Sequence, residues 1–192
     1  KKLSANGMEA TLVASEKKKE KKAPPMLYNL AELQNDCSSL FKISPSDTLK
    51  IVQELYEKKL VTYPRTDARV LSTAVAKEIY KNISGLKRYT PMAAYADEVL
   101  NMGIYKTIAK TKYVNDKQIT DHYAIIPTGQ GMGALRGLSE IAANVYEIIC
   151  RRFLSIFYPA AEYQKLSMTL AKQDEFLFAN FKYMLKEGYL KV

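Results

Sequence analysis

The sequence predicts a mainly α-helical α+β protein in which a helical domain is inserted between β-strands of a second domain. Residues 26–157 carry apolar side chains mostly at helical spacing, which predicts the helical domain. Strand-like stretches lie on both sides of it, at residues 8–14 and 165–185, and we expect strands from the two ends to pair. The predicted segments are a strand with a basic linker at 1–25, the helical domain at 26–163 and a β-hairpin at 164–192.

The composition is that of a folded protein with an anionic partner. Of the 192 residues, 47% are hydrophobic, which is enough to build a core and argues against global disorder. The net charge of +9 favours a polyanion as partner, nucleic acid first and an anionic membrane second. No stretch is long and apolar enough to span a bilayer, so we expect no membrane partner. Because the sequence does not begin with Met, we also expect it to be a piece of a longer protein.

The N-terminal segment combines a short strand with a charged run. Met8–Ala14 (MEATLVA) predicts the strand. We interpret the following EKKKEKK, Glu16–Lys22, as a solvated linker, with contacts to phosphate as the alternative. Ala23, Pro24 and Pro25 then break regular structure.

Capping signals and apolar spacing predict the first two helices of the middle segment. Residues 27–40 predict an amphipathic helix, and Ser44, followed by Pro45 and Asp47, predicts the start of the next one. One face of this second helix carries Leu49, Val52, Leu55 and Tyr56. A β-like run at 60–63 follows, so the outline is that of a winged helix-turn-helix.

The same rules predict the later elements. Helices are expected at 73–83, from Thr90 onward and, largely buried, at 141–156, with a mobile loop at 129–137. Strands are expected at 165–170 and 176–185, joined by a turn at 173–175. Cys37 and Cys150 have neither zinc-ligand nor disulfide-framework spacing, so we expect two reduced, buried cysteines and no metal site within this chain.

A tyrosine and an arginine are joined by one proline in the stretch TYPRTD. A neutral tyrosine, with a reference pKa of about 10, is a poor nucleophile, and a nearby cation favours its phenolate form. If the segment is extended, Tyr63 and Arg65 project to the same side. A guanidinium can grip phosphate oxygens with two hydrogen bonds, so the pair suits attack on a phosphodiester. Packing or a surface position is the more common role for such residues, and this alternative stays open.

The single histidine, His122, lies in QITDHYAIIPTG. A lone histidine more often lies at the surface or in the core than in a catalytic site. Here Asp121 could orient it, and the apolar residues that follow could anchor it. A histidine held in this way could donate a hydrogen bond to a phosphate oxygen or assist a leaving hydroxyl.

Three stretches in this order resemble the type IA DNA topoisomerases: LYNLAELQ at 27–34, ELYEKKLVTYPRTDARVLS at 54–72 and TDHYAIIPTG at 120–129. Proline after the tyrosine is most similar to the topoisomerase III branch. The resemblance implies that a helical tyrosine domain interrupts a β-rich arch domain. It also implies that the parent protein breaks and rejoins single DNA strands through a 5′-phosphotyrosine intermediate, without ATP.

Carried over by position, the resemblance assigns catalytic roles to three residues. Tyr63 would be the nucleophile, Arg65 would bind the scissile phosphate, and His122 would lie near that phosphate. The flanking Thr66, Arg69 and Thr128 would join Arg65 as DNA-binding residues.

The resemblance also implies what this chain lacks. The family's Mg²⁺ is held by an acidic cluster with a DxD pair in a Toprim domain, and no DxD occurs here. We therefore expect no cofactor in this chain, Mg²⁺ in the parent protein, and a fragment that binds DNA without being catalytically complete. The expected partners are single-stranded DNA and the remaining domains of a monomeric parent, in the cytoplasm at the nucleoid. Two alternatives stay open: a non-catalytic winged-helix DNA-binding module, and a purely structural or protein-interaction piece.

Overall fold

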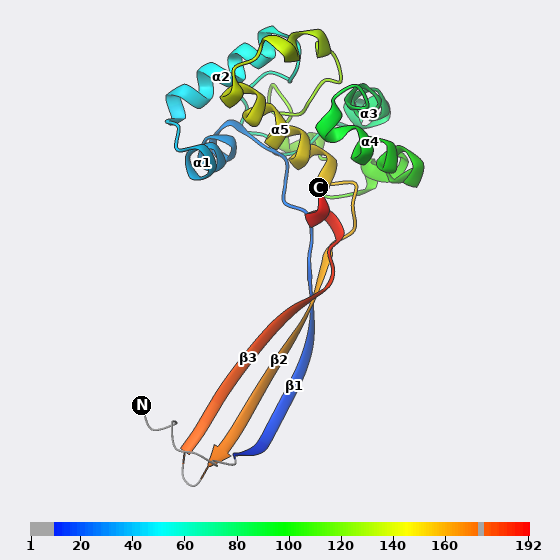
Figure 1. The fold of residues 1–192 in the computed structure, drawn as a ribbon. Helices are drawn as coiled ribbons and strands as arrows, with labels where there is room; N and C mark the ends of the chain where they lie inside the picture. The colour runs from blue at the N-terminus through cyan, green and yellow to red at the C-terminus, as the bar shows by residue number, and fades with distance from the viewer. Residues whose placement is uncertain (1–9, 173–174) are drawn as a thin grey trace. The chain divides into compact units, whose positions relative to one another are not determined.

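Strands from both ends of the chain form one sheet, and the helices lie between them in the sequence (Figure 1). The computed structural model describes residues 10–172 and 175–192. These residues form two compact units. The sheet unit comprises the described residues of Lys1–Ala23 and Pro159–Lys191, and the helical unit comprises Pro24–Tyr158 with Val192. The predicted α+β class is confirmed, whereas the finer division at 25/26 and 163/164 stays a prediction.

The sheet unit is a three-stranded antiparallel sheet in the order β1-β2-β3 (Figure 1). Its strands are β1 (Thr11–Lys22), β2 (Ala161–Lys172) and β3 (Glu175–Lys186), followed by the 3₁₀ helix η4 (Gly188–Lys191). The pairing of N-terminal with C-terminal strands is therefore confirmed. Of the expected turn at 173–175, residues 173 and 174 lie outside the described residues, as do residues 8 and 9 of the expected first strand.

The basic run Glu16–Lys22 is the second half of β1, so its interpretation as a linker is wrong. Its residues pair in register with β2, from Glu16 opposite Ser167 to Lys22 opposite Ala161. Strand pairing compensates for the low β propensity of lysine and glutamate. Ion pairs from Glu20 to Lys165 (2.6 Å) and Lys182 (3.1 Å) also reduce the charge repulsion within the sheet.

The helical unit contains the α-helices α1 (Leu30–Phe41), α2 (Pro45–Glu57), α3 (Thr73–Leu86), α4 (Thr90–Met102) and α5 (Glu140–Ser155). Three 3₁₀ helices, η1 (Ile104–Lys110), η2 (Asp116–Gln118) and η3 (Met132–Gly137), lie between α4 and α5. Helix α5 contacts α1, α2 and α4, and its side chains Val145, Ile149 and Phe153 are fully buried. This helix therefore forms the centre of the core (Figure 1).

Most predicted helix starts agree with the structure because they depend on local hydrogen bonds, whereas α1 begins at Leu30 and not at residue 27. The Ser44 side chain accepts a hydrogen bond from the Asp47 backbone N–H, and Pro45 is the first residue of α2. Asn29 caps α1 in the same way, through the Glu32 N–H. The predicted helices at 73–83, from Thr90 and at 141–156 are likewise confirmed as α3, α4 and α5.

Three local predictions need correction. Tyr56 does not belong to the buried face of α2, since 39% of its surface is exposed. The run at 60–63 is not a strand but forms an isolated β-bridge, Val61 with Pro127, and the winged-helix outline stays a prediction. The stretch 129–137, expected as a loop, contains the 3₁₀ helix η3.

Both cysteines are free thiols in buried positions, as predicted. Burial raises the pKa of the Cys37 thiol to about 11, and burial also raises that of Cys150. In the described part of the chain, no helix has the length and apolar character needed to cross a membrane.

Candidate active site

The stretches TYPRTD and DHYAIIPTG lie side by side in the helical unit. The Thr62 N–H donates to the Ile126 carbonyl and the Thr128 N–H donates to the Leu60 carbonyl, both at 3.0 Å. The Thr62 hydroxyl adds a donated bond to the Ala124 carbonyl and accepts one from the Ile126 N–H. Segments about 60 residues apart in sequence are thereby joined through their backbones.

Tyr63 and His122 are in direct ring contact. Their ring centroids are 4.4 Å apart and the ring planes are tilted by 43°. Tyr63 also meets the ring of Tyr56 edge to face, with the ring centroids 5.4 Å apart. The structure thus brings together two of the three residues predicted to be catalytic.

A buried threonine fixes the backbone at His122. The Thr66 hydroxyl donates to the His122 carbonyl at 2.8 Å and accepts from the Ala68 N–H at 3.1 Å. Only 7% of Thr66 is exposed. The side chain predicted to contact DNA therefore lies inside the protein and positions the histidine.

The backbone after Tyr63 alternates between inward and outward side chains. Pro64, Thr66 and Ala68 are buried, whereas Arg65 and Asp67 are exposed. This period of two is typical of extended backbone and places Arg65 at the surface. The projection of Tyr63 and Arg65 to the same side stays a prediction. Within the described residues, Arg65 forms no hydrogen bond or ion pair, so its guanidinium is free for a ligand.

The two other predicted DNA-binding residues make contacts within the protein. Arg69 donates to the Leu27 carbonyl at 3.2 Å and pairs with Glu32 at 3.2 Å, which joins the motif to α1. The Thr128 hydroxyl donates to the Lys59 carbonyl at 2.5 Å. Thr128 still contributes to the surface of the site, because it lines the same open hollow as Tyr63 and His122.

Tyr63 and His122 form part of the wall of an open hollow of about 550 Å³. The other lining residues come from the end of α2 and from the two motifs: Tyr56, Glu57, Lys59, Val61, Thr62, Tyr123, Thr128 and Gln130. Burial raises the pKa of Tyr123, so this phenol stays protonated. Three phenols, an imidazole, an ammonium group and a carboxylate thus line one hollow.

Close backbone packing fixes the rim of the hollow. Gly129 has φ +76°, and a Cβ at this position would lie 2.7 Å from the Asn82 carbonyl of α3. The Asn82 side chain donates to the Pro127 carbonyl at 2.9 Å, and Arg88 donates to the Gly129 carbonyl at 3.0 Å. Only glycine combines this backbone conformation with so close an approach.

The sequence interpretation missed several residues of the hollow. Tyr56, Lys59, Tyr123 and Gln130 line it but were not among the candidates. The sequence could have indicated two of them, because Tyr56 and Lys59 lie within the motif ELYEKKLVTYPRTD. Asp121 does not orient His122 as suggested, because within the described residues no hydrogen bond or ion pair joins these two side chains.

The described residues contain no group of three or more His, Cys, Asp or Glu side chains that could hold a metal ion.

Comparison with known proteins identifies the family. The family described as DNA topoisomerase matches residues 1–192. The chain belongs to the DNA topoisomerase family. Among curated relatives, DNA topoisomerase 3 of Bacillus subtilis (strain 168) is 35% identical over 187 residues, which cover 97% of this chain and 25% of that protein. DNA topoisomerase 3 of Bacillus licheniformis is 36% identical over 187 residues, with the same two coverages.

A solved structure supports the fold of this topoisomerase segment. The full-length topoisomerase I from Thermotoga maritima matches with a TM-score of 0.66 and 23% identity, over 95% of this chain and 29% of that one. The predicted membership, a type IA DNA topoisomerase most similar to topoisomerase III, is confirmed. The chain spans about a quarter of the length of the relatives it matches.

Proposed function

We propose that this chain supplies the nucleophilic tyrosine of a type IA DNA topoisomerase and that Tyr63 is this nucleophile. The observation that carries the proposal is the ring contact between Tyr63 and His122 at the wall of an open hollow. A nucleophile must be accessible to its substrate and lie beside groups that stabilise the developing charge. The exposed, unpaired Arg65 two residues later supports the same role.

In the proposed reaction, the Tyr63 Oη attacks a backbone phosphorus of single-stranded DNA. A bond from phosphorus to Oη forms and the bond from phosphorus to the 3′-oxygen breaks, which leaves a 5′-phosphotyrosine and a free 3′-hydroxyl. The phenol loses one proton to solvent and the leaving oxygen gains one, so protons and charge balance. Because one phosphate ester replaces another, the reverse attack by the 3′-hydroxyl reseals the strand without ATP.

Arg65 and His122 would assist this exchange by binding phosphate oxygens. A guanidinium presents two parallel N–H donors to a phosphate, and the positive charge favours the phenolate of the attacking tyrosine. His122, already in contact with the Tyr63 ring, could donate to a phosphate oxygen or to the leaving oxygen. Lys59 and Thr128, which line the same hollow, would contact the neighbouring backbone of the strand.

The proposed enzyme is the longer parent protein. Mg²⁺, the Toprim domain and the second half of the DNA site would come from parts of the parent beyond this chain, and the chain alone would bind DNA without completing the reaction. We further propose that the parent acts as a monomer on single-stranded DNA at the nucleoid.

The test is a parent-length protein in which Tyr63 is replaced by phenylalanine. Tyr63→Phe removes one oxygen and should abolish the covalent DNA–protein adduct, detected by denaturing electrophoresis with a labelled oligonucleotide, while affinity for DNA stays within about twofold. Tyr56→Phe is the matched control, because it removes the same atom from a ring that contacts Tyr63. Adduct formation that survives Tyr63→Phe would refute the assignment.

A non-catalytic winged-helix DNA-binding module is the second candidate, supported by the helix pair α1 and α2 and by the net charge of +9. It predicts salt-dependent DNA binding by the parent-length wild type with no covalent adduct under any condition. The same electrophoresis therefore distinguishes the two candidates.

A further inference from the structure

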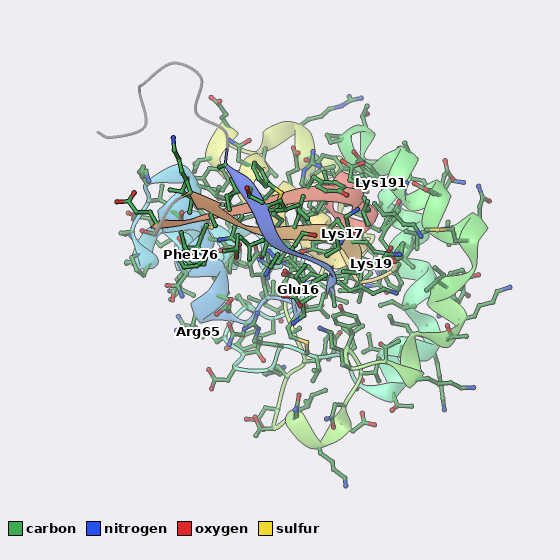
Figure 2. The ribbon with its side chains drawn as sticks, turned by 90° about the horizontal axis from the view of Figure 1, so that it is seen from below. Glu16, Lys17, Lys19, Arg65, Phe176 and Lys191 are labelled. Carbon is green, nitrogen blue, oxygen red and sulfur yellow. The ribbon has the colours of Figure 1, made fainter. Side chains whose placement is uncertain are left out.

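Strand geometry sorts the charges of the run EKKKEKK onto two faces of the sheet. Side chains alternate along a strand, so Lys17, Lys19 and Lys21 share one face of β1. Glu16, Lys18, Glu20 and Lys22 share the other, which therefore carries both acids of the run. Figure 2 shows Lys17 and Lys19 on one side of β1 and Glu16 on the other. The first face is thus more basic than the sequence of the run suggests.

The register places aromatic rings on the same face as these lysines. Lys17 lies opposite Leu166, which lies opposite Phe181, and Lys19 lies opposite Gln164, which lies opposite Tyr183. Residues opposite one another in a sheet project to the same side. We call this surface the lysine face, defined by Lys17, Lys19, Gln164, Leu166, Phe181 and Tyr183.

Side-chain contacts agree with this assignment of faces. On the opposite face, Glu20 pairs with Lys165 at 2.6 Å and with Lys182 at 3.1 Å, and Lys182 lies over the Tyr163 ring. Two lysines of that face, Lys165 and Lys182, therefore have an acid beside them. On the lysine face, Glu162 pairs with Lys21 at 3.4 Å, which leaves the next two lysines of β1 without a carboxylate.

The groups of the lysine face are accessible. Lys17 and Lys19 are exposed and, in the described part of the chain, take part in no ion pair. Phe181 and Tyr183 each expose 52% of their surface. Exposed aromatic rings beside unpaired cations are the combination with which proteins bind single-stranded nucleic acids.

The spacing also fits an extended single strand. Residues two apart on a β-strand are separated by roughly 6.7 Å, about twice the 3.4 Å rise per nucleotide of a duplex strand. The aromatic strand lies two strand spacings from the lysines, roughly 9.6 Å. An unstacked strand that runs along the sheet could therefore place phosphates over β1 and bases over β3.

We propose that the lysine face is a second binding surface for single-stranded DNA, separate from the tyrosine site and situated wholly within the sheet unit. Lys17 and Lys19 bind phosphates, and Phe181 and Tyr183 stack on bases. The inference rests on the proposed function in taking DNA as the polyanion.

The test measures binding of a labelled oligothymidylate by the 192-residue chain carrying Tyr63→Phe, with fluorescence anisotropy at several salt concentrations. Each phosphate contact contributes a salt slope of about −0.7 on single strands, so K17A/K19A should make the slope shallower by about 1.4. Phe181→Ala and Tyr183→Ala should each weaken binding roughly fivefold or more, the lower end of the range for base stacking on an aromatic ring.

Matched controls on the opposite face make the test specific. K18A/K22A removes the same charge, and Phe178→Ala removes a ring that is 75% exposed. Both should leave the affinity and the salt slope nearly unchanged. Equal losses in the K17A/K19A and K18A/K22A variants would overturn the proposal in favour of non-specific charge attraction, and no loss in either would also overturn it.

Lysine labelling in the parent-length protein tests whether the surface is free there. Lys17 and Lys19 should react with an amine-directed reagent and become protected when oligothymidylate is added. Protection without DNA would mean that other parts of the parent cover the face, and the proposal would fail. Neither the binding measurement nor the labelling depends on the covalent reaction. Failure of this proposal would therefore leave the assignment of Tyr63 as nucleophile unaffected, and failure of that assignment would leave this proposal unaffected.

Discussion

At the scale of single residues, a buried hydroxyl links the two motifs of the candidate site. Thr66 lies three residues after Tyr63, yet its side chain is directed inward to the His122 carbonyl and the Ala68 N–H. Thr66 thus fixes the backbone of the tyrosine motif relative to that of the histidine motif, and it need not contact DNA to do so. Sequence reasoning placed Thr66 at the DNA because it flanks the tyrosine, and only the alternation of the extended backbone separates inward from outward side chains.

Replacing Thr66 by valine should therefore cost stability and disturb the histidine. Valine has nearly the same shape, but its side chain can neither donate nor accept a hydrogen bond. The buried Ala68 N–H and the part-buried His122 carbonyl therefore lose their partner, at about 1–3 kcal/mol. We expect the free energy of unfolding, measured in urea, to fall by this amount, and adduct formation in the parent-length protein to fall with it. Thr66→Ser, which keeps the hydroxyl, should lose less than half as much. A Thr66→Val protein as stable as wild type would contradict the role.

At the scale of elements, the sequence predicted what local interactions determine and missed what pairing between distant segments determines. The start of α2 depends on Ser44 and Pro45, which are adjacent, and it was predicted correctly. The run Glu16–Lys22 has no local reason to be a strand, and it becomes one only because β2 pairs with it. The juxtaposition of Tyr63 and His122 is also non-local, and it was expected only from the resemblance to a family.

A series of glycine substitutions should show how tightly the rim of the hollow is packed. Gly133 has space for a Cβ, Gly103 has φ +67° with space, and Gly129 combines φ +76° with contacts to α3. A non-glycine residue in the left-handed region costs about 1–2 kcal/mol. We expect Gly133→Ala to be nearly neutral, Gly103→Ala to lose about that amount, and Gly129→Ala to lose clearly more. Thermal unfolding of the three variants measures the order of their stability losses. Equal losses for Gly103→Ala and Gly129→Ala would contradict the close packing at Gly129.

At the scale of the whole molecule, stability is lost at both ends of the pH range. Burial raises the pKa of thiols and phenols in the helical unit, to about 11 for Cys37 and about 12 for Tyr89. In the sheet unit, hydrogen bonds from Lys165 and Lys182 lower the pKa of Glu20. The contribution of Glu20 is therefore present above the ordinary pKa of glutamate and is lost in acid, whereas the contributions of Cys37 and Tyr89 are lost in alkali.

The alkaline loss can be traced to one thiol. An unfolded cysteine ionises near its ordinary pKa of 9.0, whereas folded Cys37 keeps its proton up to about pH 11. Between these values the unfolded state binds fewer protons, so stability falls as pH rises. The difference corresponds to about 3 kcal/mol, since one pKa unit is equivalent to about 1.4 kcal/mol.

Cys37→Ser removes the titrating thiol and keeps a group able to hydrogen-bond, so it serves as the comparison. Urea unfolding followed by circular dichroism should show wild-type stability falling between pH 9.0 and about 11, with a clearly shallower fall in the variant. The fall should not vanish, because burial also raises the pKa of Cys150 and of Tyr146. Parallel pH profiles for the two proteins would mean that Cys37 ionises as easily in the folded state as in the unfolded one.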